Sequence, residues 1–170
     1  MPAVPPKILV RSILDAIQLS GGTGFYASDS YRTHPRQFIC NHHDQSFSIW
    51  IYIWTLTHGG RITLPDEYRI QMTAVNSPLP LNPNGYTLLL GYYQDLNVMA
   101  GFDLLRHRTF TIGSPSVQIH LNALTNAVSN GMGFATKDNQ EIAVGIRPDR
   151  NVNAKLTPSD NRILTPSFFE

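Results

Sequence analysis

The sequence predicts a mainly β domain with two small helices, an α+β fold arranged as a small barrel or sandwich. About seven short segments carry the alternation and the β-branched and aromatic residues that are typical of strands. Only two segments have apolar residues at helical spacing, and no strand–helix–strand alternation appears. Hydrophobic residues make up 42% of the 170 residues and charged residues 15%, a balance that excludes a disordered chain.

Each element follows from a local pattern. An amphipathic helix is expected over residues 7–19, ended by the glycines at 21–24, and a second over residues 121–130, ended by Gly131. Residues 25–36 read as a loop or short irregular hairpin, and residues 106–115 as a polar, basic loop. Strands are expected over residues 37–41, 47–56, 67–75, 86–93, 97–103, 116–120, 134–136 and 141–146.

The strand over residues 47–56 has the clearest pattern. Phe47, Ile49, Ile51 and Ile53 alternate with a second set that contains Trp50, Tyr52 and Trp54. Because neighbouring side chains of a strand point to opposite faces, both faces of this strand are expected to be covered.

The bulk properties limit the class of protein. Residues 1–156 are expected to form one domain, and residues 157–170 an arm or linker. The single cysteine, Cys40, excludes a disulfide framework. The sequence contains neither a secretory pattern nor an apolar run of membrane-spanning length. A soluble, cytoplasmic protein that does not associate with a membrane is therefore expected.

No catalytic centre, metal site or cofactor is expected. His42 and His43 are adjacent, so on a strand they point to opposite faces and do not easily serve one ion. The pair Asp66-Glu67 resembles the acids of a metal-dependent nuclease, but such a site also needs a suitably placed lysine or further acid. The three lysines, Lys7, Lys137 and Lys155, are all distant from that pair in the sequence.

Basic residues give a modest indication of nucleic acid. The net charge is only +1, but ten arginines stand against three lysines. Arginine forms paired hydrogen bonds with phosphates and guanine edges, although any one of these arginines could equally be a surface charge or an ion-pair partner. The candidate DNA-contacting residues lie mostly in predicted loops: Tyr31, Arg32, His34, Arg36, His58, Arg61, Arg106, His107, Arg108, Ser114 and Ser116.

A stretch of distinctive segments carries a resemblance to a known family. The segments are YIWTLTHGGR at 52–61, DEYRIQMT at 66–73, LLLGY at 88–92, AGFD at 100–103, SPSVQ at 114–118 and EIAVGIRP at 141–148. In this order they resemble the N-terminal domain of bacterial HNH-type and methylase-associated restriction endonucleases. The resemblance covers roughly residues 46–148.

The resemblance implies DNA recognition for a restriction system, not cleavage. A nuclease domain or subunit, and a methyltransferase, are the implied protein partners of the chain. The pattern is also similar to B3-like effector domains, open pseudobarrels of about seven strands that grip the major groove with two loop arms. One implied arm holds Tyr31, Arg32, His34 and Arg36; the other lies near Arg106, His107, Arg108 and Ser114.

Two alternatives stay open at this point. One is a reader of methylated cytosine or adenine that extrudes the base into an aromatic pocket, with a hydrophobic core as the competing interpretation of the same residues: Trp50, Trp54, Tyr92, Phe102 and Asp103. The other is a protein-interaction module of a restriction–modification system, docking through an exposed strand edge.

Overall fold

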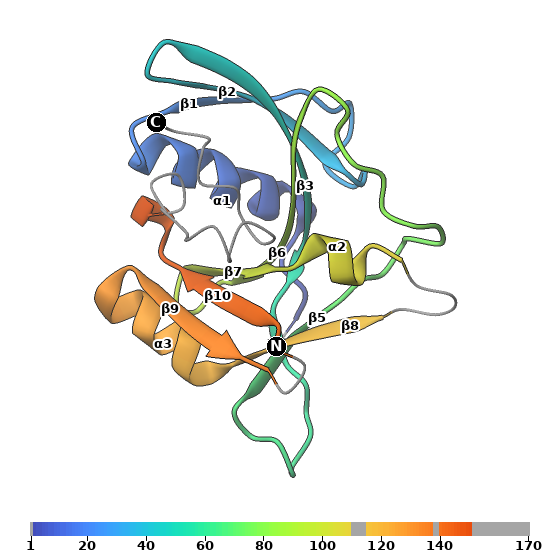
Figure 1. Cartoon of the computed structure of the whole chain (residues 1–170), viewed down its shortest axis with the longest axis vertical. Coiled ribbons are helices and arrows are strands. Elements are labelled where there is room, and N and C mark those ends of the chain that lie inside the picture. The colour runs from blue at the N-terminus through green and yellow to red at the C-terminus, as the bar shows by residue number, and fades with distance from the viewer. Residues whose placement is uncertain (1, 110–114, 138–139, 151–170) are drawn as a thin grey trace.

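A mixed sheet of seven strands runs through the molecule (Figure 1). The computed structural model describes residues 2–109, 115–137 and 140–150. All neighbouring strands are antiparallel except β3 and β6, which are parallel. The order across the sheet is β1 (Thr23–Tyr26), β2 (Arg36–His42), β3 (Gln45–Thr55), β6 (Gly85–Tyr93), β7 (Val98–Phe102), β10 (Ile142–Ile146) and β9 (Met132–Thr136).

Different elements cover the two faces of this sheet. Helix α1 (Pro6–Leu19) packs on one face and shares a hydrophobic cluster with it. A three-stranded sheet of β4 (Thr57–His58), β5 (Glu67–Gln71) and β8 (Ser116–His120) packs on the other face, together with helix α3 (Leu121–Asn130). A short 3-10 helix spans Pro148–Arg150.

Strand β3 links the two cores, as its alternation predicts. Ile49, Ile51 and Ile53 belong to the cluster that contains α1, whereas Tyr52 and Trp54 belong to the cluster on the opposite face. The expectation that both faces of this strand are covered is therefore confirmed.

Helix α3 lies very close to the sheet at two glycines. Gly133 of β9 and Gly145 of β10 are register partners. A Cβ atom built on Gly133 would lie 2.1 Å from the carbonyl oxygen of Ala123 in α3, and one built on Gly145 would lie 2.4 Å from it. Because no side chain fits in these gaps, the glycine pair fixes how closely α3 packs on β9 and β10 (Figure 1).

The mainly β expectation is confirmed, but its details need correction. The described residues contain ten strands and three α-helices, and the seven-stranded sheet is not closed into a barrel, since β1 and β9 form free edges. The third helix, α2 (Leu104–His107), lies where the expected strand over residues 97–103 ends and the expected basic loop over residues 106–115 begins. It forms there because the Asp103 carboxylate accepts hydrogen bonds from the amides of Leu105 and Arg106 and so caps the first turn.

Several boundaries also differ from the expectation. Within the stretch expected to be a loop or hairpin, residues up to Tyr26 form β1, which pairs with β2. The strand expected over residues 67–75 ends at Gln71. Ser114 and the expected C-terminal arm, residues 157–170, lie outside the described residues.

Candidate nucleic-acid interface

The structure brings the two predicted loop arms together around residues 74–80. In Arg108, the carbonyl oxygen accepts a hydrogen bond from the Leu79 amide at 2.9 Å, and Nε donates to the Leu79 carbonyl oxygen at 3.2 Å. Leu79 in turn lines a cleft that Arg32 and His34 also line. The arms therefore meet across one surface feature.

We call this feature the basic cleft. Its volume is about 380 Å³, and it is lined by Arg32, Thr33, His34, Tyr52, Ala74, Val75, Asn76, Ser77, Leu79 and Pro80. No lining residue is acidic, and the Arg32 side chain is exposed, with no hydrogen bond or ion pair to the described residues. A free guanidinium beside hydroxyl and amide groups is a suitable environment for a phosphate group.

His34 forms a wall of the basic cleft. Its ring stacks on Trp54, with centroids 4.5 Å apart and planes at 12°, and lies nearly parallel to Tyr52 at 6.3 Å. Burial, together with the nearby charge of Arg36, lowers the pKa of His34 to about 4. The imidazole is therefore neutral near pH 7 and contributes ring surface instead of charge.

Arg36 lies beneath the cleft and not on its surface. Only 2% of Arg36 is exposed. Its Nε donates to the Tyr31 carbonyl oxygen and its Nη1 to the Ile53 carbonyl oxygen, both at 3.1 Å. These bonds fasten the loop that carries Tyr31 and Arg32 to strand β3. Tyr31 is 43% exposed and stacks on Tyr26 with centroids 5.4 Å apart.

The basic residues of α2 have partners of different kinds. Arg106 Nε forms an ion pair with Asp103 Oδ2 at 3.3 Å. His107 Nε2 donates to Glu141 Oε1 at 2.6 Å, and Lys137 Nζ donates to Glu141 Oε2 at 3.1 Å. Burial alone would raise the pKa of Glu141, but the bonds and charges of His107 and Lys137 outweigh it and hold that pKa at about 2.

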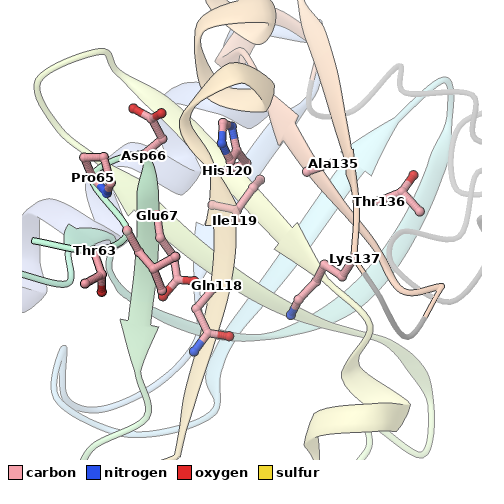
Figure 2. Close-up of a pocket in the computed structure, with 11 residues that line it drawn as sticks. Thr63, Pro65, Asp66, Glu67, Gln118, Ile119, His120, Ala135, Thr136 and Lys137 are labelled. Atoms are coloured by element: carbon pink, nitrogen blue, oxygen red, sulfur yellow. The ribbon is translucent and has the colours of Figure 1, made fainter. Parts of the chain in front are cut away.

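A second hollow, the Glu67 pocket, is lined by residues of β5, β8 and β9 and of the chain next to them (Figure 2). It has a volume of about 410 Å³, and its lining residues are Thr63, Leu64, Pro65, Asp66, Glu67, Gln118, Ile119, His120, Ala135, Thr136 and Lys137. Arg61 Nη1 lies 3.3 Å from Glu67 Oε1, and His58 Nε2 lies 2.8 Å from the Pro65 carbonyl oxygen. The predicted DNA-contacting residues His58 and Arg61 therefore lie beside this pocket and not at the basic cleft.

Sequence spacing placed Lys137 far from the acids Asp66 and Glu67, and the structure brings them to one pocket. Gln118 joins them, with its Nε2 donating to the Ser116 hydroxyl at 3.2 Å. Gln118 has a sequence signal, because it stands between Val117 and Ile119 and so faces away from the core. Within the described residues, no group of three or more His, Cys, Asp or Glu side chains could hold a metal ion.

The aromatic residues considered for a base pocket are distributed over two cores. Trp54 and Phe102 lie in the cluster with α3, whereas Tyr92 lies in the cluster with α1, on the opposite face of the sheet. Trp50 is half-buried on the Trp54 face, and Asp103 is the cap of α2. These five residues therefore do not surround one hollow.

Comparison with known proteins gives one family. The model of the family described as methylase-associated X1 matches residues 47–153. No curated protein and no solved structure matches the chain. The matched range contains α2, the Glu67 pocket and the 74–80 wall of the basic cleft, while Arg32 and His34 precede it. None of the helices in the described ranges is both long and apolar enough to cross a membrane.

Proposed function

The chain belongs to the methylase-associated X1 family, and from that premise we propose that it recognises double-stranded DNA for a restriction–modification system. In this proposal the chain performs no chemistry, and a nuclease domain or subunit cuts the DNA. A methyltransferase is the second protein partner in this proposal, in agreement with the family description, methylase-associated.

One observation carries the proposal: the basic cleft has no acidic lining residue, and its exposed Arg32 guanidinium pairs with none of the residues that the structure describes. The Arg32 guanidinium and the polar groups of Thr33, Asn76 and Ser77 would contact the phosphate backbone. Phosphate contacts supply most of the affinity of a DNA-binding protein and fix its register on the duplex.

The test is a mobility-shift titration with a randomised duplex pool at low and moderate salt. The double variant Arg32→Ala/Arg108→Ala should bind about tenfold more weakly, and its affinity should depend less steeply on salt, because each lost phosphate contact removes about 0.9 from the log–log slope. The matched control is Arg11→Ala, an exposed arginine of α1 that is paired with Asp15 at 3.4 Å and lies outside both hollows. Absence of binding at low salt, or an equal loss in the control, would contradict the proposal.

A protein-docking role is the second candidate, and one observation favours it. Phe25 and Ile39 are register partners at the β1 edge of the sheet, and they are 57% and 39% exposed. An apolar pair at a free strand edge is a common contact for a partner protein. If the chain binds no DNA but co-purifies with a methyltransferase, and Phe25→Ser abolishes that association, docking replaces DNA recognition as the function.

A further inference from the structure

The Glu67 pocket has the composition of a base-binding site. From its polar groups we propose that it receives a single nucleobase turned out of the duplex. This inference rests on the proposed DNA-binding function and adds the part of the DNA that enters the protein.

The walls and the size of the pocket fit a flat heterocycle. Its volume of about 410 Å³ lies within the range of roughly 300–1,000 Å³ that is usual for small-molecule sites. Leu64, Pro65, Ile119 and Ala135 provide apolar surface. A base that leaves the stack needs such surface to replace its lost stacking contacts.

The polar groups lie together at one end of the pocket. In Figure 2, the side chain of Lys137 points toward Glu67 and Gln118, while Asp66 and His120 point toward the other end. Glu67 Oε1 accepts no hydrogen bond among the described residues, although Arg61 Nη1 stands 3.3 Å away at ion-pair distance. Because Oε1 is buried, the acceptor that this carboxylate can offer to a ligand is Oε2, on a side chain that is 25% exposed.

This end of the pocket presents an acceptor beside a donor. The Glu67 carboxylate can only accept, and a lysine ammonium has three N–H donors, of which one from Lys137 goes to Glu141. An amino group of a base donates to the carboxylate, and a neighbouring ring nitrogen or carbonyl accepts from the lysine. In guanine and thymine a ring N–H can donate to the carboxylate and the adjacent carbonyl oxygen can accept from the lysine, so each of the four bases can satisfy this pair of groups.

The charge of the pocket excludes phosphate as its occupant. Asp66 and Glu67 line it, while Lys137 is already paired with Glu141 and Arg61 with Glu67. A phosphate would meet carboxylates here, whereas the basic cleft offers it the Arg32 guanidinium and has no acidic lining residue. The backbone therefore belongs in the basic cleft and the neutral base in the pocket.

Helix α2 connects the two hollows. Arg108, which follows α2, bonds to Leu79 of the basic cleft, and the preceding residue, His107, bonds to Glu141, which in turn holds Lys137.

The test uses duplexes with one central base opposite an abasic site, because such a base leaves the stack at low cost. Four duplexes differ in that base alone, and a fully paired duplex is the reference. Fluorescence anisotropy should show tighter binding, by about fivefold or more, for the duplexes with an unpaired base than for the fully paired reference. The four duplexes also identify which base is preferred.

Two charge-matched variants separate recognition from electrostatics. Glu67→Gln should lose the preference for the unpaired base, while Asp95→Asn, which removes one negative charge in the turn between β6 and β7, should keep it. Urea unfolding checks that both variants are folded. If the wild type binds paired and unpaired duplexes equally, or if both variants lose the preference, the base pocket is refuted and DNA binding stands. If no duplex binds at all, the proposed function itself fails.

Discussion

The basic cleft and the Glu67 pocket carry similar cations but differ in the placement of acids. At the pocket, Arg61 and Lys137 each face a carboxylate, Glu67 and Glu141 respectively. At the cleft no lining residue is acidic, and buried Arg36 is held by carbonyl oxygens instead. A count of arginines therefore does not predict a polyanion-binding surface, because the partner of each cation determines whether its charge is available.

The largest effect is expected where a cation of the cleft is buried. Arg36→Ala should lower the free energy of unfolding by about 3–5 kcal/mol, because two carbonyl oxygens lose a charged donor. Arg32→Ala, four residues away and exposed, should change it by less than about 0.5 kcal/mol. Urea unfolding of both variants measures the difference, and equal effects would show that the two arginines do not have separate roles.

The buried acid next to the pocket, Glu141, should make the free energy of unfolding depend on pH at low pH. The pKa of Glu141 is depressed from 4.5 to about 2, so its stabilising contribution is complete above about pH 4.5 and is lost as the pH falls toward 2. The full contribution corresponds to about 3 kcal/mol. Glu141→Gln should therefore be less stable at pH 7 and lose less stability between pH 5 and pH 3. Parallel curves for the two proteins would contradict this assignment.

His34 should give the cleft a different pH window. The pKa of His34 falls from 6.5 to about 4 on folding, so its neutral form stabilises the protein above about pH 6.5 and this contribution is lost as the pH falls toward 4. Since the ring is partly exposed, about 1–2 kcal/mol is expected. His34→Phe keeps the ring contact with Trp54 and should make the free energy of unfolding depend less on pH between pH 6.5 and pH 4.5. Glu141→Gln should leave most of that window unchanged.

The smallest effect is expected for the exposed pair at the pocket. The side chains of Arg61 and Glu67 are 44% and 25% exposed, and such pairs contribute less than about 1 kcal/mol. Arg61→Ala should thus change the free energy of unfolding only slightly, and less at high salt. A large loss in thermal denaturation would mean that Arg61 has a structural role comparable to that of Arg36.

Local patterns in the sequence predicted elements well, and long-range pairing poorly. The residues of β8 and α3 follow from alternation, helical spacing and Gly131, whose φ of 88° needs glycine. The parallel pairing of β3 with β6 and the separate three-stranded sheet have no local signal, because the register depends on packing over the whole chain. The α2 cap, in contrast, could have been read from Asp103.

The site residues divide in the same way. Their types were visible, but their loop positions were only partly predicted: Arg36 lies in β2, His58 in β4, Arg106 and His107 in α2, and Ser116 in β8. The burial of Arg36 and the contact of Arg108 with Leu79 depend on tertiary structure. The face of a single strand can be read from alternation, so Trp50 and Trp54 share a face. That Tyr92 lies on the opposite face follows only from the register between strands.

The connection between β3 and β6 determines when the basic cleft can form. Parallel neighbours cannot be joined by a tight turn, and here the intervening chain, residues 56–84, forms β4 and β5 and then the 74–80 wall of the cleft. During synthesis, the first 60 residues contain α1 and β1–β3 but no β6 to pair with β3. The cleft is therefore assembled late, after the ribosome has passed β6, and a nascent or truncated chain ending before that strand has no surface with which to engage a ligand.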